Sequence, residues 1–87
     1  MHISEFQQII SEKYKKRDMQ RGVPGTFMWF IEEVGELATA LASEDKKNTE
    51  EEFADVIAWL ATMANITGVD LEKACEKYTK NDIKGFK

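Results

Sequence analysis

The stretch from Phe53 to Ala64 reads FADVIAWLATMA, and it decides the fold. Its apolar residues fall on nearly every side of a helix, and neither glycine nor proline interrupts them. A helix that is apolar on all sides belongs inside a fold, so we expect most of this stretch to be buried. The helix is predicted to begin after Asn48 or Thr49 as its N-cap and to end near Asn65.

Three other segments carry the same helical periodicity. Apolar residues recur three and four positions apart in residues 4–17, in residues 26–42 and again after Asp70. Residues 18–25 hold two glycines and the only proline, which predicts a connector. No segment alternates with the period of a β-strand. The sequence therefore predicts an all-α fold, a four-helix bundle in a single domain over residues 1–87.

Composition narrows the classes of function. The single cysteine, Cys75, excludes a disulfide scaffold and a cysteine zinc site. The single histidine, His2, excludes a di-iron bundle, which needs Glu-x-x-His motifs. Residues 22–60 carry nine acidic and two basic side chains, so no uniformly basic face exists to bind polymeric nucleic acid. Without a visible signal peptide or bilayer-length apolar segment, we expect a cytoplasmic protein with no membrane partner.

Four carboxylates have a spacing that predicts a metal site. Asp55 interrupts the apolar stretch, and Glu52 lies one helical turn before it. Glu33 and Glu36 repeat this spacing in the preceding helix. None of the four has a lysine or arginine three or four positions later, so their charges repel without internal compensation. A divalent cation would relieve that repulsion, and ligation by oxygen alone favours Mg²⁺, with Mn²⁺ as the alternative.

Two motifs resemble those of a known family. Residues 32–36 read EEVGE and residues 52–55 read EFAD, which resembles the E-E-x-x-E…E-x-x-D signature of MazG-type nucleoside triphosphate pyrophosphohydrolases. Lys77, Asn81 and Lys84 are similar to the family's K-x-x-x-N-x-x-[RK] segment. The resemblance covers nearly the whole chain, and its double acidic motif is the more specific part.

The resemblance implies a Mg²⁺-dependent hydrolase. Such an enzyme cleaves a nucleoside triphosphate between its α and β phosphates, giving the monophosphate and pyrophosphate, in some cases to remove aberrant nucleotides. Carried onto this chain, the family's metal ligands are Glu33, Glu36, Glu52 and Asp55. One of these carboxylates would activate the attacking water, and Glu33 is our first candidate for that catalytic role.

The substrate contacts implied by the resemblance lie near the end of the chain. Lys77 and Lys84 are candidates for phosphate contacts, and Asn81 for a polar contact with the nucleotide. Trp59 follows Asp55 by one helical turn, so it could stack on the nucleobase beside the metal. The alternative is that Trp59 is an ordinary core tryptophan.

Self-association is the last expectation from the sequence. One small bundle cannot bury every apolar side of residues 53–64, so a second copy of the chain would cover what remains. We expect a homodimer with residues 26–42 and 49–65 at the interface, or a tetramer of two such dimers; compact relatives that the chain resembles also pair. The competing interpretation is a non-catalytic helical module that binds nucleotide or only oligomerises.

Overall fold

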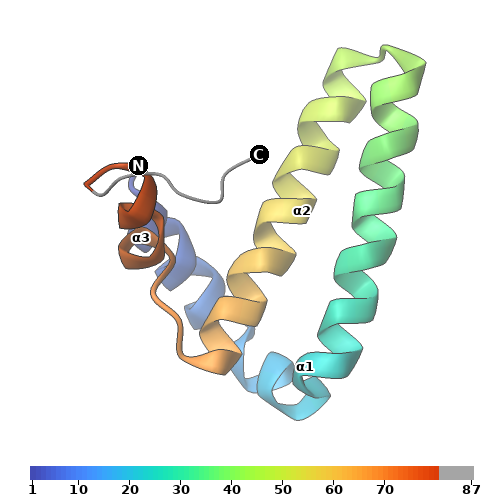
Figure 1. Ribbon diagram of the computed structural model, residues 1–87. Helices are drawn as coiled ribbons and strands as arrows, with labels where there is room; N and C mark the ends of the chain where they lie inside the picture. The colour runs from blue at the N-terminus through green and yellow to red at the C-terminus, as the bar shows by residue number, and fades with distance from the viewer. Residues whose placement is uncertain (81–87) are drawn as a thin grey trace.

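The computed structural model describes residues 1–80, and most of these residues are helical (Figure 1). Helix α1 spans Ile3–Ser43, α2 spans Lys46–Thr67, α3 spans Leu71–Ala74, and the 3₁₀ helix η1 spans Cys75–Tyr78. The predicted all-α class is confirmed, whereas the four-helix bundle stays a prediction. Among residues 1–80, no helix is both long enough and apolar enough to cross a bilayer.

A break at Gly22 divides α1 into two arms. Gly22 has φ 80° and ψ 174°, a conformation that residues with a Cβ rarely adopt. We call residues 3–21 the first arm and residues 23–43 the second arm. Pro24 follows the break within the first turn of the second arm, where its missing N–H has no helical partner to lose. The prediction of a connector over residues 18–25 is therefore wrong except at Gly22 itself.

The second arm and α2 form an antiparallel hairpin (Figure 1). Glu44 takes the left-handed conformation that ends α1, with φ 62°. Asp45 then caps α2, because its carboxylate accepts a hydrogen bond of 3.1 Å from the Asn48 N–H. The Thr49 hydroxyl donates to the Ala40 carbonyl at 3.2 Å and joins the two helices. Helix α2 thus begins earlier than the predicted cap at Asn48 or Thr49.

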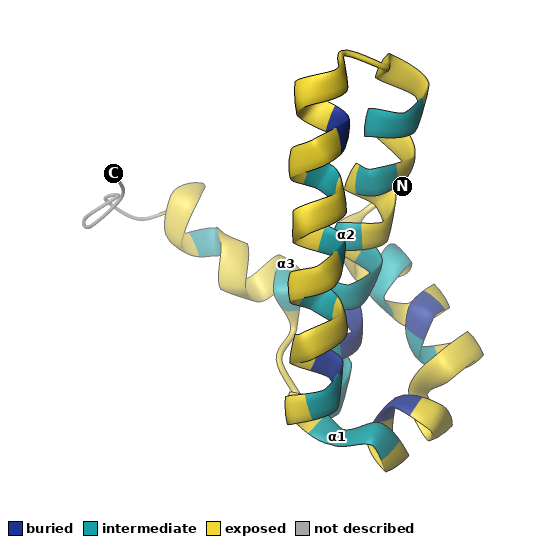
Figure 2. Cartoon of the chain, turned by 90° about the vertical axis from the view of Figure 1, so that its right-hand side faces the viewer, coloured by how far each residue is buried: buried dark blue, intermediate teal, exposed yellow. Residues whose placement is uncertain are grey.

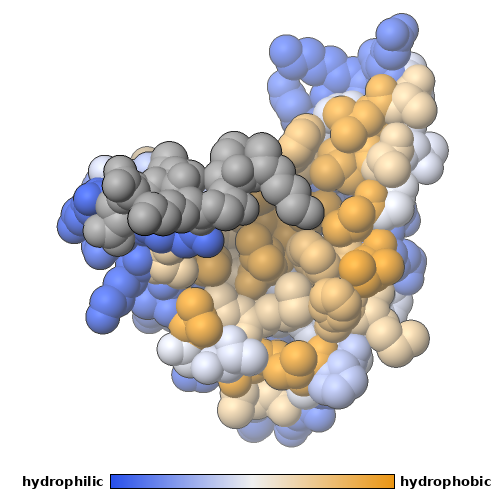
Figure 3. Space-filling model, in the orientation of Figure 1, coloured by the Kyte–Doolittle hydropathy of each residue, from blue (hydrophilic) through white to orange (hydrophobic). Residues whose placement is uncertain are grey.

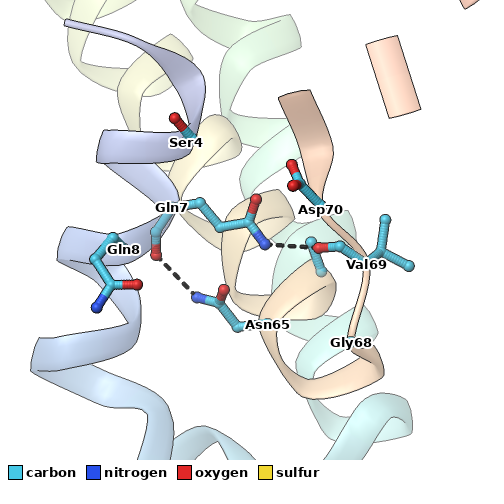
Figure 4. A pocket seen from close by; sticks show the side chains of 8 residues that line it. Ser4, Gln7, Gln8, Asn65, Gly68, Val69 and Asp70 are labelled. Atoms are coloured by element: carbon cyan, nitrogen blue, oxygen red, sulfur yellow. Dashed lines mark hydrogen bonds between the residues drawn. The ribbon is translucent and has the colours of Figure 1, made fainter. Parts of the chain in front are cut away.

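Gln7 connects the first arm to the far end of α2 (Figure 4). Its Nε2 donates to the Val69 carbonyl at 2.7 Å, and its Oε1 accepts from the Leu71 N–H at 3.0 Å. The Asn65 amide donates to the Gln7 backbone carbonyl at 3.2 Å. These contacts, which we call the Gln7 clamp, hold the first arm against α2 and the start of α3.

Few side chains of the described residues are buried, and the buried apolar ones are mostly small (Figure 2). The expectation that residues 53–64 are mostly buried is wrong for the single chain, since Phe53 is 48% exposed and Ile57 is 50% exposed. Close helix contact accommodates alanines better than large side chains. The buried apolar residues are Ile10, Ala40, Ala61 and Ala64.

The hairpin leaves large apolar side chains in water. They recur at helical spacing along each of its two helices, and Figure 3 shows apolar side chains gathered over this part of the molecule. Each is between 38% and 53% exposed. We call this set the apolar stripes: Phe27, Ile31, Val34 and Leu41 of α1, with Phe53, Ile57 and Leu60 of α2.

Candidate functional site

Three carboxylates converge between the two helices of the hairpin. Glu33 and Glu36 lie one turn apart on the second arm, and the antiparallel partner helix brings Glu52 opposite them. One carboxylate oxygen from each residue lies within 4.8 Å of the other two. We call these three residues the acidic cluster. Its oxygens have the proximity that a shared cation requires.

The acidic cluster raises the pKa of its own members. Burial raises the pKa of Glu33 to about 7, with added contributions from a hydrogen bond to Glu36 and from the charges of Glu36, Asp55 and Glu52. Burial also raises the pKa of Glu52, and the charges of Glu36 and Asp55 add to that effect. The Oε2 atoms of Glu33 and Glu52 are buried without a hydrogen-bond partner. Burial and mutual repulsion therefore favour a bound proton or a bound cation in this cluster.

Asp55 stands beside the acidic cluster rather than within it. Asp55 follows Glu52 by one turn of α2, and its charge raises the pKa of both Glu33 and Glu52. Its side chain is exposed, contrary to the expectation of a buried carboxylate. That expectation failed because the apolar residues around Asp55 are themselves exposed in the single chain. The role of Asp55 as a ligand stays a prediction.

Trp59 lies next to the site but is only half-buried. Its ring stacks on that of Trp29, with centroids 6.0 Å apart and an interplanar angle of 10°. The guanidinium carbon of Arg21 lies 4.9 Å from the centre of the Trp59 ring. Trp59 therefore joins α2 to both arms of α1. Its predicted contact with a nucleobase stays a prediction.

The other predicted substrate residues lie apart from the acidic cluster or outside the described residues. Lys77 is an exposed residue of η1, and its Nζ lies 4.9 Å from the centre of the Tyr78 ring. Asn81 and Lys84 lie outside the described residues. The proposed contacts of all three with phosphates or nucleotide therefore stay predictions.

The sequence reasoning missed a buried charged network at the break in α1. Asp18 is 2% exposed, and its Oδ1 accepts a hydrogen bond of 3.1 Å from Arg21 Nη1. The same nitrogen lies 3.3 Å from the hydroxyl of Thr26, which is fully buried. Arg21 thus bridges the two arms across Gly22. The sequence could have indicated this ion pair, because Asp18 and Arg21 carry opposite charges and lie three residues apart. That spacing brings two side chains together only in a helix, and residues 18–25 were predicted to be a connector.

Comparison with known proteins agrees with this geometry. Residues 24–84 match the MazG nucleotide pyrophosphohydrolase domain, which is more than half of the chain and includes the entire acidic cluster. No match was found among curated proteins. The suspected resemblance is thereby confirmed, and the chain belongs to the MazG nucleotide pyrophosphohydrolase family.

Proposed function

We propose that this protein is a Mg²⁺-dependent, cytoplasmic nucleoside triphosphate pyrophosphohydrolase. It would cleave ribonucleoside or deoxyribonucleoside triphosphates between the α and β phosphates, releasing the monophosphate and pyrophosphate. The convergence of Glu33, Glu36 and Glu52 without a counter-charge is the observation that supports this proposal most strongly. Membership in a family of nucleotide pyrophosphohydrolases supplies the reaction class.

The donor set of the site fits a hard divalent cation. All of its ligand atoms are carboxylate oxygens, which Mg²⁺ and Mn²⁺ prefer. Glu33, Glu36 and Glu52 would hold the cation, and we propose Asp55 as the fourth ligand. When bound, the cation neutralises phosphate oxygens and the charge that develops as the bridging bond breaks.

Glu33 suits the role of general base in this reaction. Its Oε2 is buried without a hydrogen-bond partner, so this oxygen is available to accept a proton from water. In the proposed step, a water oxygen bonds to a phosphorus atom of the α–β bridge and the bridging P–O bond breaks. The proton lost by the water passes to the carboxylate of Glu33. The electron pair of the broken bond leaves with the departing phosphate group.

Pyrophosphate release from purified protein tests this proposal. A panel of ribonucleoside and deoxyribonucleoside triphosphates would be incubated with Mg²⁺, with Mn²⁺, and with EDTA. We expect equal amounts of monophosphate and pyrophosphate with either metal, and no release in EDTA. Failure to hydrolyse any nucleotide with either metal would instead favour the non-catalytic helical module.

A matched pair of variants assigns the activity to the acidic cluster. Glu36→Gln removes one charge from the cluster and should lower kcat by at least about 100-fold, as loss of an electrostatic contact to the transition state does. Glu32→Gln makes the same chemical change at an exposed neighbouring residue outside the cluster. It should retain nearly all activity. Equal losses in both variants would contradict the assignment.

We also propose that two copies of the chain pair through the apolar stripes. Seven large side chains lie at helical spacing on the hairpin, each at least 38% exposed, and exposed apolar patches mark interaction sites. We propose that a second copy of the chain covers this surface. In a two-fold arrangement, each stripe contacts the equivalent stripe of the other copy. The minimum unit would be a homodimer, and pairing of dimers would give a tetramer.

Light scattering during size-exclusion chromatography tests the pairing. We expect a species of at least twice the 10.0 kDa chain mass. Ile57→Lys places a charge in the stripe of α2 and should yield monomers. Met19→Lys makes a similar change at a 55% exposed residue of the first arm and should leave the dimer intact. A folded wild-type monomer at micromolar concentration would refute the pairing.

A further inference from the structure

Trp29 is an exposed aromatic residue one helical turn from the acidic cluster. It precedes Glu33 by four positions and Glu36 by seven, so at about 100° per residue the three side chains share one side of α1. The rise of the helix places Trp29 about 6 Å from Glu33 and about 10 Å from Glu36 along the helix axis. Trp29 therefore lies beside the carboxylates of the cluster but not among them.

The two tryptophan rings near the cluster differ in what already contacts them. Trp59 is half-buried, and its ring contacts both the Trp29 ring and the Arg21 guanidinium. Trp29 is 47% exposed, and its ring lies nearly parallel to that of Trp59, with centroids 6.0 Å apart. Because Trp59 covers one face of the Trp29 ring, the exposed area of Trp29 includes the opposite face. Helix α2 thus supports an indole whose outer face is accessible.

The proposed pairing of two chains does not cover this ring. Trp29 lies two positions from both Phe27 and Ile31 of the apolar stripes, and two residues turn a helix by about 200°. Trp29 therefore lies nearly opposite the stripe of α1. Its outer face would stay exposed in a dimer joined through the stripes.

An exposed ring in this position suits a nucleobase. Every nucleobase has a flat π face, and such faces stack on aromatic side chains whatever the base. The ribose of a nucleotide separates its base from its phosphates, so a residue that stacks on the base must lie near the metal-binding carboxylates rather than among them. Trp29 has that position relative to Glu33 and Glu36.

We propose that the outer face of Trp29 stacks on the base of a nucleotide whose phosphates lie at the acidic cluster. The proposal rests on the proposed function, which supplies the nucleotide. Trp59 supports the Trp29 ring from the side of α2. Stacking does not read the edges of a base, so the protein accepts several bases and favours purines, whose larger rings stack more extensively.

Two single-tryptophan variants test which ring contacts the base. The chain has two tryptophans, so Trp59→Phe keeps only Trp29 and Trp29→Phe keeps only Trp59. The probe is an ATP analogue with a methylene group in place of the α–β bridging oxygen, added with Mg²⁺. We expect it to quench the fluorescence of Trp59→Phe at least about fivefold more than that of Trp29→Phe. Quenching of Trp29 that is absent, or no greater than that of Trp59, would overturn the proposal.

The Trp29→Leu variant tests the contact by kinetics, because it removes the ring but keeps an apolar side chain. We expect KM for ATP to rise at least about tenfold while kcat stays within about threefold. Inorganic tripolyphosphate has the phosphates but no base, so its inhibition constant should not change. If Trp29 only held the helix that bears Glu33, both constants would rise together, which would contradict the proposal.

Met28→Ala is the matched control for Trp29→Leu. Met28 is an apolar neighbour that is 75% exposed, and it lies about 100° around α1 from Trp29. Its removal should leave KM for ATP unchanged. An equal rise of KM in the two variants would overturn the role of Trp29.

Two outcomes separate this proposal from the proposed function. Quenching of Trp29 by the ATP analogue without hydrolysis of any triphosphate would overturn the catalytic proposal alone. Hydrolysis of ATP with an unchanged KM in a folded Trp29→Leu variant would overturn the role of Trp29 alone.

Discussion

The acidic cluster and the break in α1 each hold a carboxylate oxygen that is buried without a hydrogen-bond partner, yet they balance its charge in different ways. At the break, Arg21 lies 3.1 Å from Asp18 and supplies the counter-charge from the same helix. In the acidic cluster, Glu33 and Glu52 face other carboxylates, and burial raises the pKa of both. The two regions therefore lack different partners. The cluster needs a cation, whereas Asp18 lacks only a hydrogen-bond donor.

Removing the counter-charge at the break should have the largest effect on stability. Arg21→Met leaves Asp18 charged, buried and unpaired, which costs about 3–5 kcal/mol in the free energy of unfolding. Lys80→Met is the matched control, since Lys80 pairs with Glu76 on the surface and such pairs contribute at most about 1 kcal/mol. Urea unfolding monitored by circular dichroism measures both. If both variants lost a similar free energy of unfolding, the ion pair at the break would contribute no more than a surface ion pair.

Adding a counter-charge to the acidic cluster should stabilise the protein. Mg²⁺ at 100 times its dissociation constant adds about 2.7 kcal/mol by mass action. In EDTA, the raised pKa of Glu33 predicts stability that is fully present below about pH 4.5 and lost as pH rises through 7, because the folded state then binds more protons than the unfolded state. Thermal melts from pH 5 to pH 8 would show this loss.

The Glu33→Gln variant tests whether Glu33 causes the pH dependence of the melting temperature. Glutamine does not titrate, so the melting temperature in EDTA should fall less between pH 5 and pH 8 than it does in the wild-type protein. Glu32→Gln, at the exposed neighbour, should retain the wild-type slope. A Glu33→Gln protein with an unchanged slope would mean that other groups control the titration.

The smallest effect should come from replacing Arg21 by lysine. Lysine keeps the charge beside Asp18 but lacks the planar guanidinium, one nitrogen of which contacts both Asp18 and Thr26. We expect a loss of about 0.5–1.5 kcal/mol, the value of one hydrogen bond. Chemical unfolding would resolve this loss from that of Arg21→Met. A loss as large as that of Arg21→Met would show that geometry, rather than charge, holds the break together.

The acidic cluster was predictable because helix geometry is regular. A spacing of three residues puts Glu33 and Glu36 on one side of α1, and a hairpin of two helices leaves few positions for Glu52 other than opposite them. The all-α class followed from periodicity for the same reason. The spacing of residues along one helix does not depend on how distant parts of the chain pack.

Two features depended on information that periodicity does not carry. Glycine and proline predicted a connector over residues 18–25, but Pro24 fits the first turn of a helix, so the helical pairing of Asp18 with Arg21 went unseen. The apolar stretch around Ile57 indicated burial. An apolar pattern shows that side chains favour burial, but it does not show whether the same chain or a second copy covers them. The exposure of Asp55 follows from the same ambiguity.

The Gln7 clamp determines the order in which the two regions come apart. Its hydrogen bonds join residues 58 to 64 positions apart in sequence, whereas the hairpin closes through neighbours such as Ala40 and Thr49. Contacts between distant residues cost the most loop entropy and are the first to open in a local fluctuation. Detachment of the first arm would expose Asp18 to water while the carboxylates of the hairpin stay together. Amide hydrogen exchange in the first arm would therefore be faster than in α2, and the break in α1 would open before the acidic cluster does.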